Sequence, residues 1–198
     1  MYSDTAPTPG PYEWSDEDVA SYVDALRTLG LTDPSILLHV WQSESGLSPR
    51  PPRNGPAVGL DQWEPGTLDG LGYDVAGDPG LRAFVALSVA QQMPYVVRYY
   101  RSAAHLCTNL SGAYCWNMAP VQAERAHADP TFVICDAVAV LPGVYAGNWR
   151  AFDPGRKRGY IRGCDMVAHA DAVWDARAAD ILARVQAALA APPAPSCT

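Results

Sequence analysis

Apolar residues in this sequence recur every three or four positions, and no stretch alternates strictly between apolar and polar residues. The first spacing gives a helix one buried face, whereas the second would indicate a half-buried strand. The sequence of 198 residues contains no internal repeat and is long enough to bury a core. We therefore predict a single, mainly α domain.

The helix that matters most for function is predicted between Asp33-Pro34 and Gly46. Aspartate caps the free N–H groups of a first turn, proline suits the first helical position, and glycine suits a C-terminal stop. Glu44 continues the apolar face of this helix, which consists of Ile36, Leu37, Val40 and Trp41. A carboxyl group at the end of an apolar face is partly desolvated, which favours the neutral acid that glycoside cleavage needs. The alternative is an ordinary glutamate at a solvated helix end.

Two further helices are predicted from capping-box patterns. One occupies residues 15–30, and the other follows Ser88-Val89-Ala90-Gln91 and ends near residue 100. Because proline removes a backbone hydrogen bond inside a helix, the second helix is expected to start near Gln91 or to kink at Pro94.

Proline, glycine and charge divide the rest of the chain. More helices are predicted over residues 110–119, from Asp129 through Ile134, and as one long C-terminal helix over about 165–191. The connections include a stiff proline-rich loop at 48–56, a turn at 64–66 and a basic turn at 153–159. A flexible arm (residues 1–14) and a disordered tail (192–198) are expected to flank the domain (15–191).

Charge and hydropathy exclude several kinds of partner. The formal net charge of −7 and the absence of a basic patch argue against nucleic acid, and they give no help in binding an anionic wall or membrane. No run approaches the ~18 apolar residues of a membrane span. Residues 1–14 lack the charged-then-apolar pattern of a signal peptide, so work outside the cytoplasm would require another export route.

The cysteines and histidines do not form a metal-binding pattern. No Cys-x-x-Cys occurs and the four histidines lie far apart, so we predict no metal and no cofactor. Disulfides between Cys107 and Cys115 and between Cys135 and Cys164 can be considered. Free buried thiols are the preferred alternative.

Several segments resemble one known family. Glu-Ser-Gly-Leu-Ser-Pro at 44–49 and Gly-x-x-x-Gly-Leu-x-Gln at 55–62 are similar to the lysozyme-like domain of lytic transglycosylases and goose-type lysozymes. Phage-borne members are similar in the helix at 91–100, in Ala-Tyr-x-x-Asn-x-Ala-Pro at 113–120, and in the turn and helix at 148–167. The resemblance covers about residues 15–175 and implies a lysozyme-like helical fold.

The resemblance also implies a mechanism. Glu44 would protonate the leaving oxygen of a β-1,4 bond between N-acetylmuramic acid and N-acetylglucosamine, and would then act as a base. Many glycosidases add a second carboxylate. Lytic transglycosylases are thought to use the substrate's own N-acetyl group and muramic 6-hydroxyl, which gives a 1,6-anhydro product.

Five other residues are implied as substrate-binding, and three of them have an ordinary alternative. Ser45 would orient Glu44 or contact substrate, or else bond a backbone carbonyl at the helix end. Gln62 would bind an N-acetyl group through its amide. Gly59 would let the loop approach the saccharide, or is a plain turn glycine. Tyr114 would bond the acid or stack on a sugar, or is a core tyrosine. Asn117 lies three residues further on, on a similar helix face.

The sequence departs from the family pattern at Asp61, at residues 153–159, and in the third motif, which lacks the Tyr-Asn-Ala-Gly form of cellular members. Asp61 replaces an apolar residue and could be the second carboxylate of a hydrolase, could disfavour the charge on Glu44, or could face solvent. Glu64 is another possible second carboxylate, or a charge at a helix start. Residues 153–159 carry Arg and Lys where a calcium loop carries acids.

The leading interpretation is therefore a peptidoglycan-cleaving enzyme, a lytic transglycosylase, carried in a phage virion or delivered to the bacterial periplasm or cell wall. Its expected partners are glycan strands and other tail or ejection proteins. A lysozyme-type hydrolase assisted by Asp61 or Glu64 is one alternative. An inactive lysozyme-like structural or wall-binding virion protein is the other.

Overall fold

The helix predicted first in the chain begins and ends as expected. The structure, a computed structural model, describes residues 12–50, 57–75, 77–155 and 157–191. In it α1 (Asp16–Leu29) opens with the capping box of Ser15 and Asp18 and ends at Gly30, whose φ is +69°. A left-handed glycine at this place closes a helix without steric cost. Helix α2 (Ser35–Ser45) follows and carries Glu44 in its last turn.

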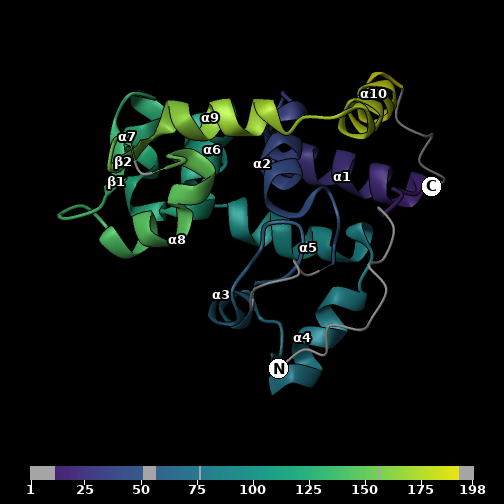
Figure 1. Ribbon diagram of the computed structural model, residues 1–198. Coiled ribbons are helices and arrows are strands. Elements are labelled where there is room, and N and C mark those ends of the chain that lie inside the picture. The colour runs from purple at the N-terminus through teal and green to yellow at the C-terminus, as the bar shows by residue number, and fades with distance from the viewer. Residues whose placement is uncertain (1–11, 51–56, 76, 156, 192–198) are drawn as a thin grey trace.

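The described residues are mainly helical with one two-stranded sheet, which confirms the predicted fold class (Figure 1). After α2 the chain forms α3 (Pro65–Gly70), α4 (Gly77–Ala86), α5 (Val89–Tyr100), a 3-10 turn η1 (Ala104–Thr108), α6 (Leu110–Met118), η2 (Pro120–Gln122) and α7 (Ala123–Ala128). It continues with β1 (Val133–Asp136), α8 (Pro142–Phe152), β2 (Tyr160–Arg162), α9 (Gly163–Ala172) and α10 (Ala176–Ala190).

Helix α2 lies in the middle of this arrangement (Figure 1). It contacts α6 and α9 on one side and α10 on another, while α1 packs against both α5 and α10. Its residues Ile36, Leu37, Leu38, Val40 and Trp41 are all buried. Because core surrounds α2, its last turn is fixed in position from several sides.

Three sequence predictions are wrong. The segment after Asp129 forms strand β1, not a helix, because Val133, Cys135 and Asp136 pair antiparallel with β2. The expected turn at Glu64-Pro65-Gly66 is the start of α3. In β1, the β-branched residues Val133 and Ile134 favour a strand, but a strand forms only where a partner strand exists. Here the partner is β2, which lies far along the sequence.

The long C-terminal helix is the third error, because it is two helices. Asp175 takes an extended backbone and its carboxylate accepts the N–H of Ala178 at 2.8 Å, which caps α10. The break lets Trp174 stack on His39 with ring centroids 3.9 Å apart. Tertiary packing on α2 therefore overrides the continuous apolar periodicity.

The segments predicted to flank the domain lie mostly outside the described residues. The arm predicted over residues 1–14 lies outside the described residues except for its last three, and there Trp14 is a core residue that donates to the Leu47 carbonyl at 2.9 Å. The predicted tail (192–198) and most of the proline-rich loop (51–56) also lie outside the described residues. In α5, the helix starts at Val89, two residues before the expected start, and runs on through Pro94.

Candidate active site

The end of α2 is held by its own backbone and by contacts from two other segments. Gly46 and Leu47 both have positive φ, and their N–H groups bond the carbonyls of Gln42 and Trp41. The guanidinium of Arg177 donates to the Gly46 carbonyl, while the Trp14 indole bonds Leu47. A non-glycine residue with positive φ carries a conformational cost that the surrounding packing must offset. The last turn of α2 is therefore rigidly placed.

Glu44 lies in this turn, half-buried, among neutral hydrogen-bond donors. The hydroxyl of Tyr114 and the amide of Asn117, both on α6, hydrogen bond with its carboxyl group. Tyr114 in turn lies 2.5 Å from the Ser43 hydroxyl, on α2 itself. Since Tyr114 is fully buried, its ring fixes the direction of the hydroxyl. The structure thus brings together three of the predicted site residues.

The turn that follows α2 in the sequence returns beside it. An isolated bridge between Val58 and Trp63 closes this turn. Gly59 has φ +78°, and a Cβ there would lie 2.8 Å from Phe84 and 2.9 Å from Gln92. Gln92 also accepts the Leu60 N–H at 3.2 Å. Only glycine fits at position 59, because the turn packs tightly onto α4 and α5.

Asp61, at the tip of this turn, is 1% exposed. Its Oδ1 atom accepts the Trp41 indole N–H at 2.8 Å and the Tyr100 hydroxyl at 2.5 Å, while Oδ2 has no partner among the described residues. The backbone carbonyl of Asp61 accepts from the Asn117 amide at 3.1 Å. Asn117 therefore connects the turn with Glu44.

The pKa values of both carboxyl groups are raised. The pKa of Glu44 is raised to about 7, because burial and, to a smaller extent, the nearby Asp61 outweigh the bonds from Tyr114 and Asn117, which act to lower it. Burial likewise raises the pKa of Asp61 to about 7, against the bonds from Tyr100 and Trp41. A carboxyl group with a pKa near 7 can give and take a proton at neutral pH, as an acid–base catalyst must.

The other predicted residues are placed differently. Ser45 donates to the Trp41 carbonyl at 3.0 Å, which is the ordinary helix-end alternative. The amide of Gln62 donates to the carbonyl of Gly59 at 2.9 Å, within its own turn. Glu64 is exposed at the start of α3, which agrees with the alternative that it is an ordinary charge at a helix start. Asp61 does not face solvent, so that alternative is excluded.

Four residues of this network were not predicted as site residues: Ser43, Trp41, Tyr99 and Tyr100. Trp41 and Tyr100 bind Asp61, Ser43 binds Tyr114, and the Tyr99 hydroxyl lies 3.5 Å from the Asn117 amide oxygen. Tyr99 and Tyr100, which are adjacent at the end of a predicted helix, could have indicated this network from the sequence, because buried hydroxyl groups need polar partners.

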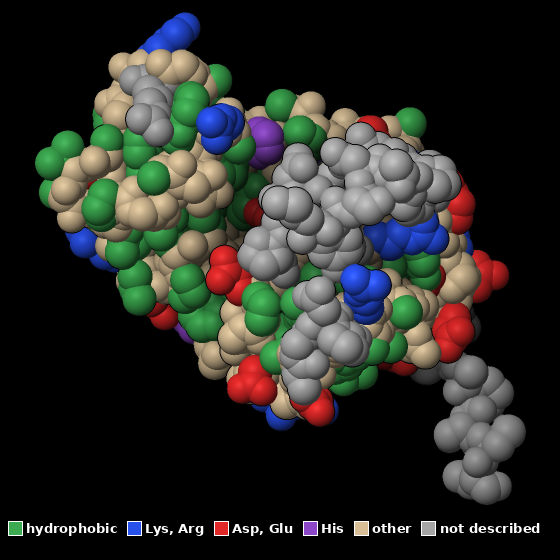
Figure 2. Space-filling model, turned by 60° about the horizontal axis from the view of Figure 1, so that its bottom comes forward, with side chains coloured by type: hydrophobic (Ala, Val, Ile, Leu, Met, Phe, Trp, Pro, Cys, Tyr) green, Lys and Arg blue, Asp and Glu red, His purple; other side chains and the backbone are tan. Residues whose placement is uncertain are grey.

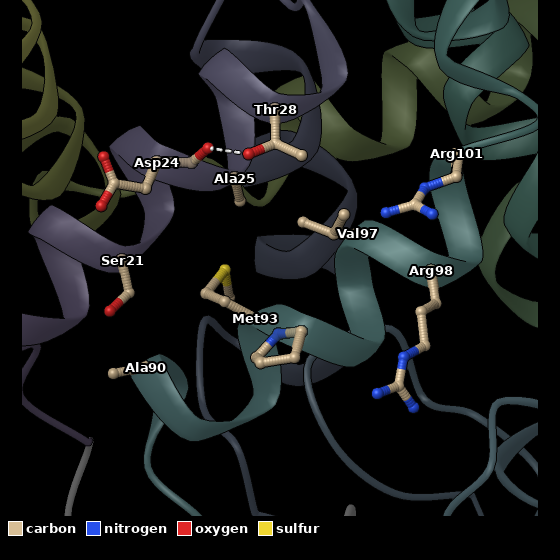
Figure 3. A pocket seen from close by; sticks show the side chains of 10 residues that line it. Ser21, Asp24, Ala25, Thr28, Ala90, Met93, Val97, Arg98 and Arg101 are labelled. Atoms are coloured by element: carbon tan, nitrogen blue, oxygen red, sulfur yellow. Dashed lines mark hydrogen bonds between the residues drawn. The ribbon is translucent and has the colours of Figure 1, made fainter.

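The surface shown in Figure 2 is hollowed between two parts of the molecule, with an acidic side chain visible inside the hollow. A separate shallow pocket of about 400 Å³ lies between α1 and α5, where Met93 and Val97 form its apolar part and Arg98 and Arg101 lie at one end (Figure 3). This pocket contains none of the predicted site residues.

The described part of the chain also bears on metal sites, thiols and membrane spans. Within it no cluster of three or more His, Cys, Asp or Glu side chains could hold a metal ion. The thiols of Cys107, Cys115, Cys135 and Cys164 are free, and the first three are buried. None of the described helices is both long and apolar enough to cross a membrane.

Comparison of the chain with protein-family models, with curated proteins and with solved structures finds no match.

Proposed function

We propose that this protein cleaves the β-1,4 bond between N-acetylmuramic acid and N-acetylglucosamine in peptidoglycan, with Glu44 as the catalytic acid. The observation that carries the proposal is the setting of Glu44. Its carboxyl group is half-buried at a rigid helix end, is held by Tyr114 and Asn117, and has a pKa raised to about 7. The resemblance of residues 44–49, 55–62 and 113–120 to lytic transglycosylases supplies the substrate class.

In the proposed reaction, neutral Glu44 donates its proton to the leaving glycosidic oxygen. The carboxylate that remains then accepts a proton from the attacking hydroxyl group. Tyr114 and Asn117 donate to this carboxylate and so stabilise it as it forms. The cycle returns Glu44 to its protonated state.

Attack by the muramic 6-hydroxyl, giving 1,6-anhydro ends, is favoured over attack by water. A hydrolase that inverts or retains needs a second carboxylate facing the sugar. Asp61 is 1% exposed, and Glu64 is the exposed N-cap residue of α3, whose side chain makes no capping hydrogen bond. Asp61 is therefore shielded from substrate, and no capping bond holds the Glu64 carboxylate in place. Transport in a phage particle, and contacts with other virion proteins, stay predictions from the resemblance alone.

Digestion of purified peptidoglycan tests the proposal. Wild-type protein, Glu44→Gln and the matched control Glu64→Gln are incubated with the polymer, and released fragments are identified by mass spectrometry. Wild type and Glu64→Gln should release fragments with anhydro ends, and Glu44→Gln should be slower by at least about 100-fold.

The other outcomes separate the alternatives. Fragments with reducing ends would indicate a hydrolase in place of a transglycosylase. No fragments from wild type, or equal release by Glu44→Gln, would refute the catalytic assignment and favour an inactive wall-binding protein.

A further inference from the structure

Asp61 is an unusual buried acid, because no cationic side chain among the described residues pairs with it. The groups that face it from the packed elements are Trp41 and Glu44 on α2, Tyr99 and Tyr100 on α5, Tyr22 on α1 and Cys107 in η1. Among these described neighbours every ionisable group is acidic. A buried carboxyl group in such surroundings holds its proton unusually tightly.

The position of Asp61 relative to Glu44 is fixed twice. Trp41, which binds the Asp61 side chain, lies one helical turn before Glu44 on the same helix. Asn117 binds both the Asp61 carbonyl and the Glu44 carboxyl group. The two acids are thereby held at a constant separation inside protein, where charges interact more strongly than in water.

We propose that Asp61 is a positioning residue for Glu44, which ties the 58–63 turn to α2 and α5 and whose charge keeps the catalytic proton on Glu44. The proposal rests on the proposed function only for its biological meaning. The charge coupling itself is a property of the folded protein. In this role Asp61 sets the pH range in which Glu44 is protonated. It does not contact substrate.

A purely structural role for Asp61 makes a different prediction. Asparagine retains an oxygen that can accept from Trp41 and Tyr100, and its amide nitrogen would occupy the place of the unpartnered Oδ2 atom. Asp61→Asn therefore preserves the two hydrogen bonds and removes the charge. If the role is structural, this variant titrates like wild type.

The test is an NMR titration of protein in which the five glutamate side chains are labelled with ¹³C at the carboxyl carbon, with Glu44→Gln used to assign the Glu44 signal. In Asp61→Asn the midpoint of Glu44 should move to lower pH. The basic limb of the pH–activity profile on peptidoglycan should move with it, so that activity drops several-fold more at pH 8 than at pH 5. An unchanged midpoint would overturn the proposal.

A second measurement does not depend on the variant. In wild type labelled at both Asp and Glu, the Glu44 curve should show two steps, of which one coincides with the titration of Asp61. A single-step Glu44 curve would refute the coupling. If the titrations agree but no peptidoglycan is cleaved, the proposed function fails while the coupling stands.

Discussion

Two regions of this protein bury a carboxyl group, and they treat it in opposite ways. Asp153 is 1% exposed, and its oxygens accept from the backbone N–H groups of Arg158 and Gly159, the Tyr145 hydroxyl and the Arg158 guanidinium. Among the described residues, Glu44 and Asp61 have neutral donors only, and one oxygen of Asp61 has no partner there.

The pKa values follow these surroundings. Burial acts to raise the pKa of Asp153, but the bonds from Gly159, Tyr145 and Arg158 outweigh burial and lower it. For Glu44 and Asp61 burial prevails and raises both pKa values to about 7. A charge that is fully paired stabilises a turn, whereas an unpaired acid costs stability and is available for proton transfer.

A large loss of stability is expected when the paired acid is neutralised. Asp153→Asn should lower the free energy of unfolding by about 2 kcal/mol, because donors from Arg158 and Gly159 lose a charged acceptor. Urea denaturation at neutral pH measures this change. Asp16→Asn is the matched control, since Asp16 forms an exposed pair with Arg184, and its effect should stay below about 1 kcal/mol. Equal effects would remove the distinction between the two regions.

Removing the unpaired acid should have the opposite sign. The folded-state pKa of Glu44 lies above its ordinary value of 4.5, so its protonation stabilises the fold at low pH, and this contribution is lost as pH rises through about 7. Glu44→Gln should therefore be more stable than wild type by up to about 3 kcal/mol at pH 8 and by nothing at pH 4. Denaturation curves at the two pH values test the sign, and a less stable variant at pH 8 would contradict it.

The smallest effect is expected from single hydroxyl groups. Tyr114→Phe removes a donor to Glu44, so activity on peptidoglycan should fall about ten-fold and its basic limb should move to higher pH. Tyr145→Phe removes the equivalent donor to Asp153 and should cost about 1 kcal/mol of stability with no change in the pH profile. A pH profile that moves in both variants would show that the contrast between the regions is not local.

How far the sequence predicts the fold depends on the distance over which each signal acts. The capping boxes of α1 and α5 and the Gly46 end of α2 were predictable because a helix end depends on three or four neighbouring residues. The start of α2 was not, because Pro34 and not Asp33 is its N-cap residue. Strand β1 was not, because it exists only through its pairing with β2. The break between α9 and α10 also depends on a distant partner, the stacking of Trp174 on His39.

The same rule holds at the site. Glu44, Tyr114 and Asn117 were predicted and lie together, since helix periodicity and the resemblance both marked them. Ser45 and Gln62 were predicted to bind substrate, yet their side chains bond nearby backbone carbonyls, as short polar side chains at helix ends and turns commonly do. The burial of Asp61 was unforeseen because it depends on Tyr100, on a helix far along the chain.

The central claim is that the unpaired acid Glu44, and not the paired acid Asp153, performs the chemistry. The most direct test is digestion of purified peptidoglycan by wild type, Glu44→Gln and Asp153→Asn at a temperature where all three are folded. The account predicts fragments from wild type and Asp153→Asn and almost none from Glu44→Gln. Fragments released by Glu44→Gln at the wild-type rate would contradict it.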